Sequence, residues 1–283
     1  MQEMIKKLTS VQSNILVELA RYKFLTASQL HKLNVGKDIG WIRTQAKELE
    51  QRSTPFIERI TFGIVPRVGR LESVFYLTKQ GKDALIEGLN MHQDEIKLPI
   101  GNASLFYKDY KHRRNTIDFQ ISLYQYIEPK EDFQVDFFDC YFDKLGNNRT
   151  GGNLEAKNKI LIGEDDYIIP DAVFMLSNVE RKFLFLFEMY DGKDTKRVFE
   201  QVRKHVRATT LGSPNEKYKH QNAHRIVLLF EFERMKHAFL ERTKNNKYFS
   251  EVAQLFRCKS IEGMNEDFFR GWENLKGESV GFI

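Results

Sequence analysis

Two neighbouring apolar runs in the second half of the chain constrain its fold most. They are YIIPDAVFML at residues 167–176 and KFLFLFEMY at residues 182–190, and such short apolar runs are typical of buried β-strands. Each run carries one carboxylate, Asp171 in the first and Glu188 in the second. A buried carboxylate is costly unless a charged or hydrogen-bonding group meets it, so the two acids indicate a site with chemistry of its own.

Each acid also has a simpler interpretation. Pro-Asp is a common turn pair, so Asp171 could mark a turn after Pro170. Its position between YII and AVFML makes a turn the weaker interpretation. Glu188 could mark the point where a strand leaves the core. Asp165 and Asp166 are close enough in sequence to add a ligand, although the rim of a hairpin is their default place.

Length and composition set the class of protein. The chain has 283 residues, enough for two ordinary domains, and 41% of them are hydrophobic. No apolar stretch is long enough for a membrane span, and the first ten residues lack the apolar segment of a secretion signal. Cys140 and Cys258 lack the spacing of a zinc site or a disulfide framework. We therefore expect a cytoplasmic protein without a membrane segment.

The first hundred residues account for most of the net positive charge. They carry 15 of the 44 Lys and Arg residues and 11 of the 39 Asp and Glu residues, which gives this segment +4 of the total +5. Apolar spacing predicts three helices, at residues 8–25, 26–36 and 38–52. Thr9 or Ser10 can cap the first and Thr26 the second, and the apolar positions of the third are Trp41, Ile42, Ala46 and Leu49. Alternating residues then predict a β-hairpin, and KQGKDALIEGL predicts a further helix.

This order predicts a winged helix-turn-helix over residues 1–90, and YLTKQGKDAL resembles the segment where the wing of such domains returns to the next helix. The third helix would enter the major groove of DNA. Its expected contacts are Lys37, Arg43, Thr44 and Lys47, and at the wing tip Arg67 and Arg70 would meet phosphate or the minor groove. The alternative is a winged helix used for protein contact, with these charges facing solvent.

The rest of the chain predicts a linker at residues 91–105 and a second domain at 106–283. That domain begins with a helix at residues 107–127, continues with strand-like runs, and adds a helix at 195–208 and a buried strand at 225–232. The predicted fold class is therefore α+β, with a small DNA-binding domain before a larger α/β core.

The order of these elements resembles the core of PD-(D/E)xK nucleases, with Asp171 and Glu188 in the two acid positions. The resemblance implies that both acids bind Mg²⁺ or Mn²⁺, hard cations that prefer oxygen ligands. Such a cation activates a nucleophile or polarises a phosphate. The chain departs from the motif at Tyr190, where the family has a lysine. Lys193 or Lys204 could supply the missing positive charge.

A broader resemblance covers nearly the whole chain. A winged helix, then HRRNTIDFQISL, PDAVFML and FLFEMYDGKD, looks like the plasmid replication–relaxation family and the related MOBC-type conjugative relaxases. In that pattern His112 matches the histidine that opens the first core helix, and Lys204 supplies the basic residue of the helix after the acid. Gln201 lies one helical turn earlier in the same row.

The resemblance implies a metal-dependent relaxase that nicks one strand of duplex DNA at the origin of a mobile element, with coupling or accessory mobilisation proteins as possible partners. The alternative is a non-catalytic plasmid replication or regulatory protein that binds DNA and keeps the nuclease fold as a scaffold. Tyr190 could be a nucleophile, a hydrogen-bond donor to phosphate, or filler for a lysine that has moved to position 204.

Overall fold

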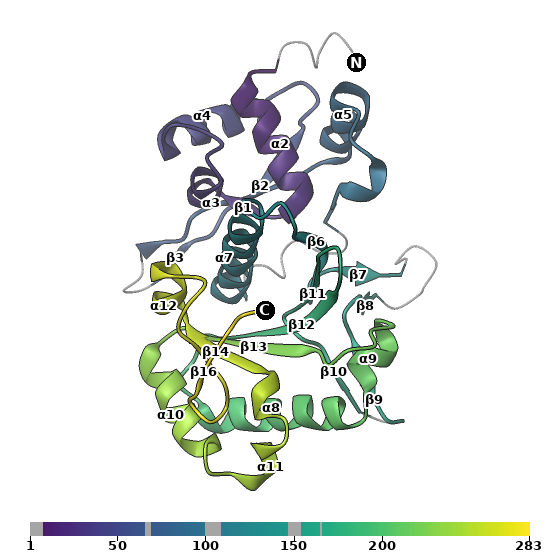
Figure 1. Ribbon diagram of the computed structural model, residues 1–283. Coiled ribbons are helices and arrows are strands. Elements are labelled where there is room, and N and C mark those ends of the chain that lie inside the picture. The colour runs from purple at the N-terminus through teal and green to yellow at the C-terminus, as the bar shows by residue number, and fades with distance from the viewer. Residues whose placement is uncertain (1–7, 66–68, 100–108, 147–153, 165) are drawn as a thin grey trace. The chain divides into compact units, whose positions relative to one another are not determined.

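The computed structural model describes residues 8–65, 69–99, 109–146, 154–164 and 166–283. The chain has a mixed α+β fold and divides into two compact units, Met1–Ile117 and Asp118–Ile283 (Figure 1). The division falls inside helix α7 (Tyr110–Ile127), so the opening turns of this helix belong to the first unit and the remainder to the second.

Three helices open the first unit, and a side chain caps each of them. They are α2 (Ser10–Tyr22), α3 (Ala27–Lys32) and α4 (Ile39–Glu50). Thr9 and Thr26 form capping boxes at α2 and α3, and the Asp38 carboxylate accepts the backbone N–H of Trp41 at α4. Each cap satisfies a helix N–H that has no partner inside the helix. The expected cap at Thr26 is confirmed, and of the two candidates for the first helix, Thr9 and Ser10, Thr9 is the cap.

A three-stranded sheet completes the first unit. Its order is β1 (Leu25–Thr26), β5 (Val74–Leu77) and β2 (Ile57–Ile60), with antiparallel neighbours. Between β2 and β5 in the chain, β3 (Ile64–Val65) and β4 (Gly69–Arg70) form a short antiparallel pair. Helix α5 (Lys79–Leu89) follows, and a short 3-10 helix covers Gln93–Glu95 in the segment expected to be a linker.

The second unit is built on a seven-stranded mixed sheet. Its order is β16 (Ser279–Val280), β15 (Trp272–Glu273), β14 (Phe256–Ser260), β13 (Arg225–Phe230), β12 (Lys182–Tyr190), β11 (Ala172–Ser177) and β6 (Gln134–Cys140). Strands β12, β13 and β14 are parallel, and the others run antiparallel to their neighbours. Small two-stranded pairs, β7 (Lys144–Leu145) with β8 (Glu155–Ala156) and β9 (Ile160–Ile162) with β10 (Asp166–Ile168), lie outside this sheet.

Two different cores cover the faces of this sheet. One face packs aliphatic side chains against α8 (Thr195–Thr210) and α10 (Glu233–Thr243), with Val198, Val202 and Val206 as the inward row of α8. The other face carries stacked rings. Phe119 of α7 stacks on Phe187 with ring centroids 4.1 Å apart. Alternation along each strand separates the two sets, because successive side chains point to opposite faces.

The run at residues 167–176 is two strands and not one. Residues up to Ile168 belong to β10, which pairs with β9, and β11 starts at Ala172 in the main sheet. Pro170 and Asp171 fall between them, and the Asn158 side-chain amide donates to the Pro170 carbonyl at 2.6 Å. The expectation of one continuous strand is wrong, because the chain changes sheets at the Pro-Asp step.

Most other expected elements are present, with ends shifted by a few residues. Trp41 was expected among the apolar positions of its helix, together with Ile42, Ala46 and Leu49. Those three are fully buried, whereas Trp41 is 41% exposed. Lys37 lies over its ring, with 5.8 Å between the ammonium and the ring centroid.

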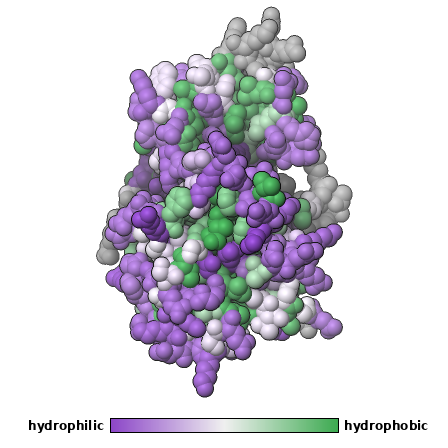
Figure 2. Space-filling view, in the orientation of Figure 1, coloured by the Kyte–Doolittle hydropathy of each residue, from purple (hydrophilic) through white to green (hydrophobic). Residues whose placement is uncertain are grey.

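The surface is predominantly polar on the face shown in Figure 2, where hydrophobic residues emerge between hydrophilic ones. Large exposed hydrophobic side chains include Val179, Ile64 and Leu161. Within the described ranges, no helix has the length and apolar content needed to cross a membrane.

We predict that Phe187→Ala lowers the free energy of unfolding by about 3–5 kcal/mol, because the ring is fully buried and stacked on Phe119. Urea unfolding of the purified chain measures this loss. Val179→Ala is the control, because that side chain is 94% exposed and its change should stay within about 0.5 kcal/mol. Equal effects of both variants would contradict the assigned core.

Candidate functional site

The register between β11 and β12 places the two acids opposite each other. Ala172 pairs with Phe187 in this antiparallel ladder, so the next step of the register sets Asp171 beside Glu188. Residues opposite each other in such a pair project from the same face of the sheet. The Asp171 carboxylate also crosses to β12, where Oδ2 accepts the backbone N–H of Met189 at 2.7 Å. Both acids therefore lie where β11 begins and β12 ends, on the α8 face of the sheet.

Glu188 has a buried histidine as a partner. The Nε2 atom of His205 lies 2.6 Å from Glu188 Oε1, and both side chains are almost fully buried. Burial lowers the pKa of His205 to about 4, although the nearby Asp171 carboxylate acts in the opposite direction. A neutral imidazole donates one hydrogen bond, so the Nε2–H tautomer fits this contact. The histidine therefore fixes the orientation of the Glu188 carboxylate.

Helix α8 carries His205 to this position for a local reason. Its N-terminus is capped by Asp194, whose carboxylate accepts the N–H groups of Lys196 and Arg197, each at 3.0 Å. His205 comes three residues after Val202 and therefore lies on the row that faces the sheet. Sequence analysis missed His205, although a histidine within the apolar row of an amphipathic helix was a usable signal.

Tyr190 projects into the aliphatic core on the same face. Its ring centroid lies 5.3 Å from that of Phe230, and the side chain is 7% exposed. Among the described residues its hydroxyl has no hydrogen-bond partner. Burial, and then the charges of Glu188 and Asp171, raise the pKa of this phenol well above its ordinary value. The phenol is therefore protonated at neutral pH and serves mainly as packing.

The basic residues expected beside the acids have other contacts. The Lys204 ammonium lies 2.9 Å from Asp166 on β10, and Arg207 approaches the same carboxylate at 3.4 Å. The hydrogen bond from Lys204 lowers the pKa of Asp166. Gln201 is half-buried one turn before His205, and Lys193 is exposed.

His112 and Asp165 are the remaining residues that the sequence associates with this site. His112 is half-buried in the first turn of α7 and belongs to the first unit, whereas the two acids belong to the second. Its carbonyl accepts the hydroxyl of Thr116 at 3.0 Å. Asp165 lies outside the described residues.

Asp171 and Glu188 offer a divalent cation oxygen ligands only. Within the described ranges, no group of three or more His, Cys, Asp or Glu side chains is arranged to hold a metal. Asp171 and Glu188 supply carboxylate oxygens from two adjacent strands. Mg²⁺ characteristically binds through one or two carboxylates and completes its shell with water and phosphate oxygens. Two acids on one face fit that cation better than zinc, which requires nitrogen or sulfur ligands.

A cleft in the first unit gathers most of the residues expected to bind DNA. It has a volume of about 550 Å³, and its charged and hydroxyl-bearing lining residues are Arg43, Thr44, Lys47, Arg59, Arg70, Glu72 and Ser73. They come from α4, β2, β4 and the segment between β4 and β5. Lys37 is exposed and not among the lining residues, and Arg67 lies outside the described residues. Sequence analysis missed Arg59, whose signal was an outward position on a strand of the hairpin.

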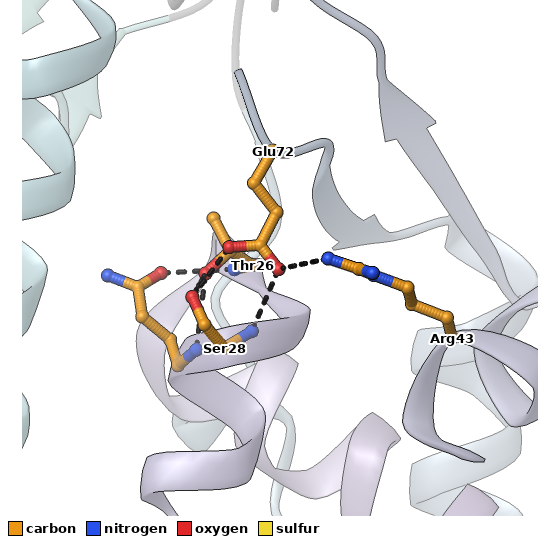
Figure 3. Close-up of polar contacts among 5 residues, drawn as sticks. Thr26, Ser28, Arg43 and Glu72 are labelled. Atoms are coloured by element: carbon orange, nitrogen blue, oxygen red, sulfur yellow. Dashed lines mark hydrogen bonds and ion pairs between the residues drawn. The ribbon is translucent and has the colours of Figure 1, made fainter. Parts of the chain in front are cut away.

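Glu72 ties the wall of this cleft together (Figure 3). Its Oε1 atom accepts the Ser28 backbone N–H at 3.0 Å and lies 3.3 Å from an Arg43 guanidinium nitrogen. Its Oε2 atom accepts the Ser28 hydroxyl at 2.5 Å, and that hydroxyl lies 3.0 Å from the hydroxyl of Thr26. One carboxylate thus connects α3, α4 and the segment that leads into β5.

Comparison of the chain with protein-family models, with curated proteins and with solved structures gives no match.

We predict that the chain loses stability as pH falls, because protonation of His224 favours the unfolded state. This side chain is 2% exposed and contacts Asn215 at 2.7 Å and Thr209 at 3.1 Å. Burial, and then His205 and His220, lower the pKa of His224 to about 4. Its unfolded form binds a proton more readily, so the contribution to stability is complete above the ordinary pKa and is lost as pH falls toward the folded value.

Between about pH 7 and about pH 5, the wild type should lose about 2 kcal/mol more free energy of unfolding than His224→Gln, as measured by urea titration. His237→Gln is the matched control, because that histidine is 64% exposed on α10. Identical pH profiles for the wild type and His224→Gln would show that His224 is not held neutral in the folded state.

Proposed function

We propose that the chain is a DNA relaxase of a mobile element that nicks one strand of duplex DNA. In this proposal the first unit is a winged helix-turn-helix and the second is a PD-(D/E)xK-like core. The observation that carries the proposal is that Asp171, one residue before the Ala172–Phe187 pair, lies beside Glu188 and accepts the backbone N–H of Met189 on the same strand. The protein would act in the cytoplasm on duplex DNA, with coupling or accessory mobilisation proteins as partners.

Asp171 and Glu188 would hold Mg²⁺ or Mn²⁺ through their carboxylate oxygens. When bound, such a cation activates the attacking group and stabilises charge on the phosphate. Met189 N–H orients the Asp171 carboxylate, and His205 orients the Glu188 carboxylate. These contacts restrict both acids before DNA arrives, which is the usual role of groups behind metal ligands.

Tyr190 in this proposal is filler at the motif's lysine position. Its buried hydroxyl and raised pKa favour packing over attack on phosphate. The basic group that contacts the scissile phosphate would then come from helix α8 or from the residues just before it. Lys204 is a candidate if it exchanges Asp166 for phosphate, since the pair is half-exposed and such pairs contribute little stability.

DNA binding in this proposal belongs to the cleft of the first unit. Arg43, Thr44 and Lys47 project from α4, and Arg59 and Arg70 project from the hairpin strands. Four cations around one concave surface suit a phosphate backbone, which accepts hydrogen bonds and ion pairs along its length. Arg59 pairs with Glu50 at 3.0 Å, and its side chain is 44% exposed.

A second candidate function is a DNA-binding regulatory protein whose second unit is a non-catalytic scaffold. The specific observation in its favour is that no lysine occupies the position where the motif has one. Tyr190 fills it with a buried ring, and the Lys204 ammonium contacts Asp166. Glu188 is also 6% exposed, so a cation would require local opening around it. The two candidates differ in one measurable property, metal-dependent nicking.

We predict that Asp171→Asn and Glu188→Gln each reduce nicking by about 100-fold or more, because each removes a carboxylate ligand while loss of even an orienting group costs roughly 10- to 100-fold. The measurement is relaxation of a supercoiled plasmid that carries the element's own origin, with Mg²⁺ or Mn²⁺. His205→Gln should give an intermediate loss, and Tyr190→Phe should retain activity because its hydroxyl has no described partner.

Wild-type rates for both acid variants would reject this active site. A wild-type chain that binds DNA tightly and leaves the plasmid supercoiled would support the scaffold function instead.

We also predict that Arg43→Ala combined with Lys47→Ala weakens binding of the full chain to duplex DNA and makes its salt dependence shallower. Each lost phosphate contact should reduce the slope of log affinity against log salt by about 0.9. Fluorescence anisotropy between about 50 and about 200 mM salt measures both quantities. Lys82→Ala on α5 is the control, because Lys82 does not line the cleft. Equal affinities for the double variant and the control would place DNA elsewhere on the chain.

A further inference from the structure

An acid occupies a cleft whose other charged residues are all cations. Among the described residues that line it, Glu72 is the only acid beside Arg43, Lys47, Arg59 and Arg70. Its side chain is 17% exposed, so it lies in the wall of the cleft and not at the rim. A carboxylate in a surface suited to phosphate requires an explanation beyond solubility.

The contacts of Glu72 explain its position. It accepts three hydrogen bonds, from the Arg43 guanidinium, the Ser28 hydroxyl and the Ser28 backbone N–H. A phosphodiester uses the same kinds of donors, because its unesterified oxygens accept bonds from Arg, hydroxyl and amide groups. The carboxylate therefore takes, inside the folded chain, donors that a DNA phosphate would use.

The other cations of the cleft differ in how they are engaged. Arg59 pairs with Glu50 at 3.0 Å. For Lys47 and Arg70 the described part of the chain offers no carboxylate within 4.0 Å. Arg43 on α4 is the cation that contacts Glu72, at 3.3 Å (Figure 3). Competition between Glu72 and DNA is thus concentrated on Arg43.

We propose that Glu72 is a built-in competitor for DNA phosphate, which holds Arg43 and lowers the affinity of the cleft for duplex DNA. This inference rests on the proposed DNA binding of the first unit. On binding, the Arg43 guanidinium exchanges the carboxylate for a phosphate, while Ser28 retains Glu72. The exchange is feasible because the Arg43 side chain is 60% exposed, and exposed ion pairs contribute little free energy.

A positioning role for Glu72 would have the opposite sign. If the carboxylate aimed Arg43 at DNA, its removal would leave a long side chain without a fixed direction and would weaken binding. We favour competition, because the bond to Glu72 engages Nη2 of Arg43, one of the guanidinium nitrogens that would donate to a phosphate. The bond therefore uses the group that would otherwise reach phosphate.

The test compares Glu72→Gln with the wild type in the full chain, with a short mixed-sequence DNA duplex as the probe. The glutamine keeps the size and an acceptor for Ser28 but removes the charge. We expect affinity to rise about two- to five-fold at low salt, the range of an exposed ion pair. The slope of log affinity against log salt should become steeper by about 0.9, the value of one additional phosphate contact.

Glu87→Gln on α5 is the matched control, because it makes the same change in charge at an exposed position outside the cleft. It should alter affinity much less than Glu72→Gln. The gain from Glu72→Gln should also disappear when Arg43→Ala is present, because the proposed competition acts through that guanidinium. Thermal unfolding of each variant shows that the fold is retained.

The outcomes separate this inference from the proposed function. If the wild type binds the duplex and Glu72→Gln binds equally or more weakly, the competitor role is rejected and DNA binding stands. A gain that survives in the Arg43→Ala background also rejects the proposed route through Arg43. If neither the wild type nor Glu72→Gln binds the duplex, both the inference and the proposed function fail.

Discussion

The antiparallel register between β11 and β12 is the constraint on which the second unit depends. The pairing of Ala172 with Phe187 sets Asp171 beside Glu188 and directs both toward α8. The same register places Phe187 on the opposite face, where it stacks on Phe119. A shift of one residue would turn the side chains of the shifted strand to the opposite face, which would separate the two acids and place one of them among aromatic rings. Packing of the rings and placement of the acids are therefore consequences of one alignment.

Burial of Glu188 would be unfavourable without a donor, and His205 provides one. A histidine suits this place because it can be neutral, so the pair needs no second buried charge. The arrangement restricts the carboxylate without neutralising it through a salt bridge. Tyr190 instead adds apolar volume between the sheet and α8. The polar pair Glu188–His205 thus lies directly beside the packed core between the sheet and α8.

In the first unit, the electrostatic feature of interest is a group of cations close to one another. Several cations face one cleft, and a single carboxylate within it connects three segments of the chain. Glu72 stabilises the approach of α3 to α4 through Ser28 and Arg43 while reducing local repulsion among cations. If the cleft binds DNA, the same contact sets a limit on affinity. Glu72 would then stabilise the free unit and, at the same time, weaken its binding to DNA.

The sequence by itself determined the local structure and the identity of the acids. Apolar spacing and the caps at Thr9 and Thr26 located helices of the first unit, because these signals act within a few residues. The tertiary structure alone decided the partners of the charges. Glu188 meets His205, 17 residues away, and Lys204 meets Asp166, 38 residues away. Such contacts depend on strand order and on which face each helix covers, and neither property is encoded in local spacing. For the same reason the Pro-Asp step appeared to interrupt one strand, whereas the folded chain uses it to pass from one sheet to another.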